Sequence, residues 1–206
     1  MGVFTPCGLV SKRTSWHASE VFLEALIQSF LLVSVGEMGD KTQLLALVLA
    51  ARYRKPWAVM AGILVATMVN HGLSAWAGGL LSALLSPSAL RWLLACAFFA
   101  FAAWVLVPDK DEGFAERGHW GAFVSTTVAF FLAEMGDKTQ LATVALGAMF
   151  SNLWLVTIGT TLGMLVTNSI AVFCGHKLLD RIPMKWIRIL ACLLFLVSGL
   201  VVIFGF

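Results

Sequence analysis

Six long apolar stretches alternate with short polar segments along the chain. Each stretch is close to or longer than the roughly 20 residues that an α-helix needs to cross about 30 Å of hydrocarbon. The stretches cover residues 21–51, 56–83, 90–107, 120–150, 153–176 and 186–206. Because the segments between them are too short to hold a soluble domain, the pattern predicts an all-α integral membrane protein with six transmembrane helices.

The sequence also contains an internal repeat. Glu-Met-Gly-Asp-Lys-Thr-Gln-Leu occurs at residues 37–44 and again at residues 134–141, an offset of 97 with eight identities in eight positions. Further identities at the same offset are Trp57 with Trp154, Gly62 with Gly159, Gly78 with Gly175, and Arg91 with Arg188. The duplication therefore extends over three apolar stretches in each half.

This repeat predicts how the chain is divided. We expect an N-terminal tail over residues 1–20, a first three-helix repeat over 21–107, an acidic linker over 108–119 and a second three-helix repeat over 120–206. An odd number of crossings starts the second repeat on the opposite side of the membrane, so the two repeats are expected to be inverted copies. Inverted repeats are typical of secondary transporters, which place the substrate site at the repeat interface.

Composition and charge support a membrane protein and predict its orientation. The chain is 60% apolar and 12% charged, whereas soluble domains carry about a quarter charged residues. Of the 14 Lys and Arg residues, nine lie in segments on one side, three lie on the side of both termini and two lie within apolar stretches. Since cytoplasmic loops carry the excess of Lys and Arg, both termini should face away from the cytoplasm. The scattered cations do not form the basic face of a nucleic-acid binder.

The duplicated motif places ionisable groups at membrane depth. Four carboxylates and two lysines leave a charge of −2 when all are ionised, which one divalent cation or two protons would balance. The expected metal ligands are Glu37, Asp40, Glu134 and Asp137, and the charge-balancing residues are Lys41 and Lys138. Such groups are costly in a bilayer unless they are paired or coordinated, so they predict a functional site. The structural alternative is that each lysine neutralises an acid of its own motif.

The donor atoms narrow the class of ion. Carboxylate, amide and hydroxyl oxygens suit a hard cation such as Ca²⁺, Mn²⁺ or Mg²⁺ and suit Cu⁺ or Zn²⁺ poorly. Additional cation-binding oxygens are expected from Thr42, Gln43, Thr139 and Gln140. Asn70, His71 and Asn168 are candidates to complete the site, although a buried His or Asn in a membrane helix is as often an interhelical hydrogen-bond partner. Glu24 and Gln28 could line a vestibule, but placement at the membrane interface is the simpler interpretation.

The first apolar stretch is too long for a simple crossing. Its 31 residues would span roughly 46 Å as one straight helix, so it must tilt strongly or break. Gly36 and Gly39 flank Glu37 in its middle, where a membrane helix can unwind if its backbone lines a cavity. The second copy keeps Gly136 but has Ala133 in place of the first glycine, so the two copies are expected to unwind to different extents.

The doubled motif resembles that of the Golgi manganese/calcium–proton exchanger family, which includes bacterial manganese exporters of the MneA type. The resemblance covers the chain from about residue 20, and the family motif Glu-x-Gly-Asp-(Lys/Arg)-(Thr/Ser) is matched at residues 37–42 and 134–139 without departure. It implies export of a cation from the cytosol, with the motif acids as ligands, Mn²⁺ as the commoner bacterial substrate and Ca²⁺ as the alternative. It also implies a cell inner-membrane location.

Together these observations predict a secondary active transporter that exports a divalent cation in exchange for protons by alternating access. The expected partners are the metal ion, protons and the lipid bilayer, with no resident cofactor and no nucleic acid. Two other functions stay open, a passive divalent cation channel and an exporter of a basic amino acid, whose ammonium group the same acids could hold. An enzyme is not indicated, because no nucleophile–base pair accompanies the acids. The pattern does not determine the oligomeric state.

Overall fold

The computed structural model describes residues 10–107, 121–150, 152–175 and 184–205, and the regular structure in these ranges is helical. In chain order the helices are α1 (Val10–Gly36), α2 (Lys41–Tyr53), α3 (Pro56–Leu84), α4 (Pro87–Trp104), α5 (Ala122–Glu134), α6 (Lys138–Phe150), α7 (Leu153–Ser169), the π-helix η1 (Ile170–Cys174) and α9 (Met184–Gly205). The expected linker over 108–119 lies outside the described residues, as do residues 1–9 of the expected tail.

Several helices are long and apolar enough to cross a membrane. Four meet this requirement singly, namely α3, α4, α7 with its continuation η1, and α9. A fifth span results if α1 and α2, which are bent by 74° at a short break, count as one crossing. Because α5 and α6 have only 13 residues each, neither half of the stretch 120–150 is long enough alone. The described part of the chain is thus all-helical and contains four or five candidate spans, as in a multi-pass membrane protein.

Both copies of the motif interrupt their helix. Helix α1 ends at Gly36 and helix α5 ends at Glu134, so the first break begins one position earlier in the repeat. Glycine is a poor helix former and alanine the best, which explains why Ala133 keeps α5 helical where Gly36 ends α1. Within the breaks, Gly39 and Gly136 adopt φ values of +80° and +77°, which favour glycine over residues with a side chain. The expected break and its unequal extent are both present.

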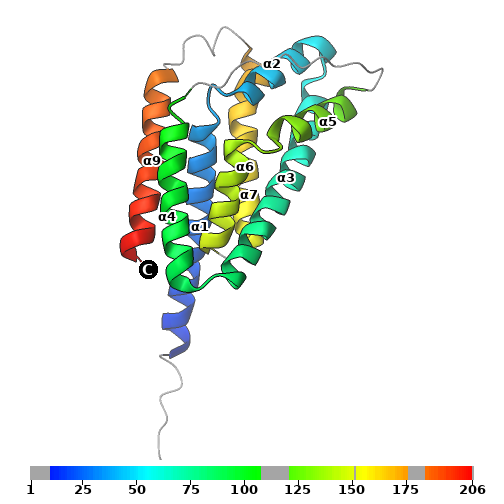
Figure 1. Cartoon of the computed structure of the whole chain (residues 1–206). Helices are drawn as coiled ribbons and strands as arrows, with labels where there is room; N and C mark the ends of the chain where they lie inside the picture. The colour runs from blue at the N-terminus through cyan, green and yellow to red at the C-terminus, as the bar shows by residue number, and fades with distance from the viewer. Residues whose placement is uncertain (1–9, 108–120, 151, 176–183, 206) are drawn as a thin grey trace, which may run out of the picture.

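Helix α1 begins well before the apolar stretch that predicted it. It starts at Val10, inside the segment 1–20 that we expected as a tail. Hydropathy marks only the residues that enter hydrocarbon, whereas a helix can continue into water through polar residues such as those of 11–20. The lower part of α1 accordingly extends past the other helices in Figure 1.

The remaining helices begin at matching positions in the two halves. Helices α2 and α6, α3 and α7, and α4 and α9 each start 97 residues apart. Local sequence explains several of these starts. Pro56 and Pro87 occupy the first turn, where a missing N–H costs nothing, and the Ser86 hydroxyl accepts a hydrogen bond from the Ala89 N–H at 3.4 Å.

Two helix contacts are equivalent in the two halves of the chain. Helix α1 packs on α7 and α5 packs on α3, while α4 and α9 stand side by side at one edge of the bundle (Figure 1). A Cβ at Gly62 of α3 would meet Thr126 of α5 at 2.7 Å, and a Cβ at Gly159 of α7 would meet Ser29 of α1 at 2.9 Å. Glycine at these two positions therefore allows the same close helix approach in both halves.

Another pair of equivalent glycines has different surroundings. A Cβ at Gly78 of α3 would lie 2.1 Å from the carbonyl oxygen of Val144 in α6, and a Cβ at Gly147 would lie 2.5 Å from that of Ala75. The matching residue of the second half, Gly175, follows η1 with a φ of +70°, and a Cβ there would meet no atom of the described residues within 4 Å. Helices α3 and α6 are therefore in close backbone contact at Gly78, and the described residues make no equivalent close contact at Gly175.

Candidate functional site

Each break is braced by the glutamine of its motif. The Gly39 N–H donates to Gln43 Oε1 at 2.9 Å, and the Gly136 N–H donates to Gln140 Oε1 at 2.6 Å. Gln43 also donates from Nε2 to the carbonyl oxygen of Thr167 in α7 at 2.8 Å. These hydrogen bonds satisfy backbone groups that the interrupted helices leave unpaired, a requirement at membrane depth. The expected ligands Gln43 and Gln140 thus have their side-chain oxygens bonded to the turns.

The two motifs are joined by reciprocal ion pairs. Lys138 Nζ lies 2.9 Å from Asp40 Oδ1, and Lys41 Nζ lies 3.2 Å from Asp137 Oδ1. The aspartate side chains are only 2% and 6% exposed, so these pairs are shielded from solvent. Each lysine pairs with the aspartate of the other motif. The structural alternative in which each lysine neutralises an acid of its own motif therefore does not describe these two contacts.

Three of the four expected acids come together. One oxygen each from Glu37, Asp40 and Asp137 lies within 4.8 Å of the others, and all three residues are buried. The second oxygens of the two aspartates, Asp40 Oδ2 and Asp137 Oδ2, have no hydrogen-bond partner within the described part of the chain. Three convergent carboxylates, two of which have an oxygen without a hydrogen-bond partner in the described structure, are suitable ligands for a hard divalent cation.

The two glutamates of the motifs have unequal surroundings. Glu37 accepts a hydrogen bond from the Thr42 hydroxyl at 2.9 Å on Oε2 and another from the Thr139 hydroxyl on Oε1. Thr139 belongs to the second motif, so this contact also crosses between the halves. Glu134 is equally buried, but neither of its oxygens has a partner among the described residues and it lies outside the three-carboxylate group.

The expected auxiliary residues are all buried but have different contacts. Asn70 Nδ2 donates to the carbonyl oxygen of Phe131 in α5 at 3.1 Å, and Asn168 Nδ2 donates to that of Met164 in its own helix at 2.9 Å. Both ring nitrogens of His71 lack a partner in the described structure, and His71 is not part of the carboxylate group. Asn70 thus makes an interhelical hydrogen bond, as the alternative interpretation proposed.

Helices α4 and α9 also line a cavity beside the second motif, which the motif residues alone do not indicate. A cavity of about 10 Å³ lies beside Lys138 and Thr139, and Phe101 of α4 and Phe195 of α9 line its wall. The two aromatic rings contact each other with centroids 5.9 Å apart. These phenylalanines lie in uniformly apolar stretches, so no sequence signal distinguishes them from residues that face lipid.

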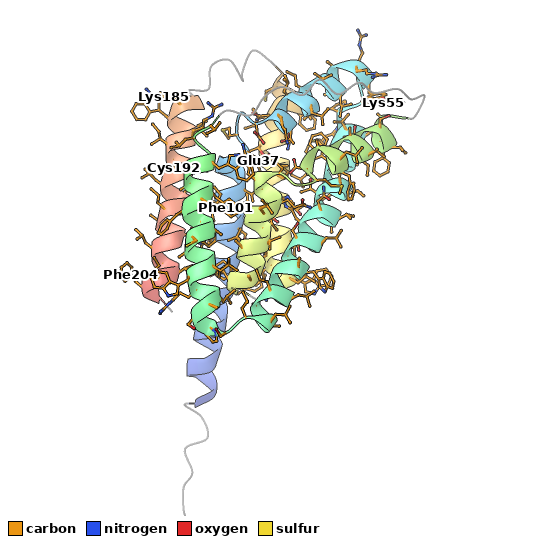
Figure 2. All side chains as sticks on the ribbon, in the orientation of Figure 1. Glu37, Lys55, Phe101, Lys185, Cys192 and Phe204 are labelled. Atoms are coloured by element: carbon orange, nitrogen blue, oxygen red, sulfur yellow. The ribbon has the colours of Figure 1, made fainter. Side chains whose placement is uncertain are left out.

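The carboxylate site is nearer to one end of the bundle. Figure 2 shows Glu37 above Phe101 and closer to the end that carries Lys55 and Lys185 than to the end of Phe204. The end of α9 lies at the opposite end of the bundle, and the start of α1 extends beyond it on the same side (Figure 1). The site is therefore offset from the middle toward the end that carries these two cations.

Comparison with known proteins identifies the family. The model of the family described as "Divalent cation/proton antiporter GDT1" matches residues 25–113 and 122–205. A Vibrio cholerae protein named "Putative manganese exporter" is 44% identical over 187 residues, covering 90% of this chain and 94% of that protein. A GDT1-like protein of Synechocystis is 30% identical over 202 residues, covering 87% of this chain and 96% of that protein.

A plant relative extends the comparison. GDT1-like protein 3 of Arabidopsis thaliana is 31% identical over 208 residues, covering 87% of this chain and 70% of that protein. No solved structure matches. The family match covers most of the chain and includes both motifs, in agreement with the resemblance noted from residues 37–42 and 134–139. The chain belongs to the GDT1 family of divalent cation/proton antiporters, and it is a cation transporter of the membrane and not an enzyme.

Proposed function

We propose that this protein exports a divalent cation in exchange for protons, and that the ion binds between Glu37, Asp40 and Asp137. The observation that carries this proposal is the convergence of the three carboxylates, contributed by both motifs, within 4.8 Å. A site assembled from both halves can change when the halves move relative to each other, which a site within one half cannot do as readily.

The charges indicate how metal and protons compete. The four motif acids carry −4 and the two motif lysines carry +2, so that −2 remains to be balanced. One divalent ion or two protons restores neutrality, and an uncompensated charge is costly at membrane depth. We therefore propose exchange of one metal ion for two protons, in which protonation of the acids from one side releases the metal to that side.

Mn²⁺ is the proposed substrate. The site offers oxygen ligands, which accept Mn²⁺, Ca²⁺ and Mg²⁺. Manganese is favoured by the Vibrio cholerae relative, whose name describes a manganese exporter and which is 44% identical to this chain. Asp40 Oδ2, Asp137 Oδ2 and a Glu37 oxygen would supply the anionic ligands, while the hydroxyls of Thr42 and Thr139 would orient Glu37.

The motif glutamines are proposed to act mainly on the backbone. Gln43 and Gln140 hold the turns at Gly39 and Gly136 through their side-chain oxygens. A second lone pair on each oxygen could still reach an ion, but the bonds present support a positioning role. Glu134, which lacks a partner in the described structure, is proposed to join the ion in the opposite access state, in the position that Glu37 occupies here.

We further propose an architecture of six crossings in two inverted three-helix repeats, over 21–107 and 120–206. Matching helix starts 97 residues apart and the equivalent contacts at Gly62 and Gly159 support it. The unequal environments of Gly78 and Gly175 support alternating access, because exchanging them would open one side and close the other. The excess of Lys and Arg supports termini that face away from the cytoplasm in a cell inner membrane.

Transport in proteoliposomes tests the proposal. Vesicles with an acidic interior, clamped at zero membrane potential, should accumulate Mn²⁺ as protons leave. With two protons exchanged for each ion, a gradient of one pH unit should support accumulation of about 100-fold. Glu37→Gln should abolish this uptake while the protein stays in the membrane. Equilibration of Mn²⁺ without accumulation would instead indicate a channel, and competition by lysine or arginine would indicate an amino-acid exporter.

A further inference from the structure

A groove between α1 and α9 faces the lipid and lies apart from the carboxylate site. It has a volume of about 280 Å³ and is lined on one side by α1 residues between Leu23 and Leu32, and on the other by α9 residues between Leu194 and Val201. Most of the lining is aliphatic, and Leu23, Ile27 and Val197 are 50–56% exposed. Within the hydrocarbon core of a membrane, lipid chains contact such aliphatic surfaces, because no water is present there.

A buried leucine lies at the inner end of the groove. Leu32 lines both this groove and the cavity beside Lys138 and Thr139, and it is only 2% exposed. The single polar pair along the groove wall, Gln28 Nε2 to Ser198 Oγ, is satisfied internally at 2.8 Å. An aliphatic groove that ends at a buried leucine is better suited to a hydrocarbon chain than to a hydrated ion.

The dimensions fit one chain of a lipid. From Glu24 to Leu32 an α-helix rises about 12 Å, which gives the groove a mean cross-section of about 23 Å², comparable with one extended hydrocarbon chain. The groove therefore has room for a single hydrocarbon chain.

A carboxylate stands at the mouth of the groove. Glu24 is exposed, lines the groove and has no hydrogen bond or ion pair to any described residue. Glu24 lies in the first turn of the apolar stretch 21–51, directly after the polar residues of 11–20. A side chain at the start of a membrane-spanning stretch lies near the level of the lipid headgroups.

We propose that the α1–α9 groove binds one acyl chain of an amine-bearing phospholipid whose ammonium group pairs with Glu24. A primary ammonium donates hydrogen bonds to a carboxylate, whereas the quaternary ammonium of choline lipids has no N–H and glycerol headgroups carry no positive charge. The groove supplies a fit for the chain, and Glu24 supplies the preference for the headgroup.

Native mass spectrometry of the full chain with phosphatidylethanolamine or phosphatidylglycerol of identical acyl chains tests this site. The wild-type protein should retain one phosphatidylethanolamine in preference to phosphatidylglycerol, by roughly five-fold for an ion pair near the surface. Glu24→Gln should remove the preference without preventing chain binding. The matched variant Glu20→Gln, one turn earlier in α1, should leave the preference unchanged.

A second variant tests the groove itself. Val197→Trp should fill it and reduce retention of both lipids, with the melting temperature measured as a check of folding. Equal preference in the wild type and Glu24→Gln would overturn the headgroup assignment, and so would an equal loss in Glu20→Gln. Unchanged lipid retention in a folded Val197→Trp would overturn the chain site, as would a dimer that Val197→Trp dissociates. None of these results depends on whether the protein transports Mn²⁺.

Discussion

Lys138 Nζ lies 2.9 Å from Asp40 Oδ1, so that a lysine of one motif neutralises an aspartate of the other. The reciprocal pair joins Lys41 to Asp137 at 3.2 Å. Both ion pairs cross between the halves. The lysines and aspartates that determine the charge of the site therefore also join its two halves. Relative movement of the halves must therefore change these contacts.

The first prediction concerns this crossed pair. Lys138→Gln should leave Asp40 buried without its cation, a change that costs about 3–5 kcal/mol when one partner of a buried pair is removed. At 2–4 °C for each kcal/mol in a chain of this size, the melting temperature in detergent should fall by about 6–20 °C. The matched variant Lys55→Gln, at an exposed position, should melt like the wild type.

The charge-swapped double variant separates stability from transport. Asp40→Lys combined with Lys138→Asp should recover much of the lost melting temperature, because opposite charges again face each other. It should not transport Mn²⁺, since a lysine then occupies the position of a proposed ligand. A single Lys138→Gln variant with wild-type stability would show that the pair contributes nothing to holding the motifs together.

The second prediction uses the neighbouring glycines of α3. Gly78→Ala should force α3 and α6 apart, because its Cβ would lie 2.1 Å from the Val144 carbonyl oxygen, whereas Gly79→Ala has open space. Overpacking costs about 1–3 kcal/mol, which lowers the population of this closed contact by about five-fold to more than 100-fold. Mn²⁺ transport should fall accordingly in Gly78→Ala and stay near wild type in Gly79→Ala. Equal Mn²⁺ transport rates in the two variants would show that the close contact between α3 and α6 is not needed for transport.

The third prediction compares the two motif glutamates. Glu134 is buried without a partner in the described structure, whereas Glu37 accepts hydrogen bonds from Thr42 and Thr139. Burying a neutral amide costs less free energy than burying an unpaired carboxylate, so replacing Glu134 by glutamine should stabilise this conformation. Glu134→Gln should therefore raise the melting temperature, Glu37→Gln should not, and both should abolish transport. Retained transport in Glu134→Gln would refute its role in the opposite access state.

The fourth prediction concerns the turn of the second motif. At Gly136, with φ at +77° and open space around it, a side chain is opposed only by the backbone conformation. Gly136→Ala should cost about 1–2 kcal/mol, and Gly136→Asn should cost less because Asn tolerates the left-handed region. Thermal melting of the two variants measures the difference. Alanine and asparagine variants of equal stability would mean that the turn is not held in this conformation.

Much of this arrangement could be predicted from the sequence, but the partners of the motif residues could not. Charged residues in apolar stretches indicated Glu37 and Asp137 directly, and the length and glycines of the first stretch indicated the break at Gly39. The adjacent Asp and Lys residues of one motif do not indicate that each of them pairs with a residue of the other motif. This pairing depends on how the two broken helices pack against each other. The same limitation applies to Glu134, which matches Glu37 in sequence but not in its contacts.

Helix ends away from the motif were also hard to predict. The stretch 153–176 gave no sign that α7 changes to the π-helix η1, since its apolar pattern continues through Ile170–Cys174. The start of α1 at Val10 was missed because a helix that leaves the membrane loses its hydrophobic signal. Tertiary packing determines both features.

Equilibrium binding of radioactive Mn²⁺ to the purified chain can show whether the two motifs form one site. We expect one ion bound per chain, with binding lost equally in Asp40→Asn, from the first motif, and in Asp137→Asn, from the second. Two ions per chain, or one variant that binds like the wild type, would contradict a single site shared by the two motifs.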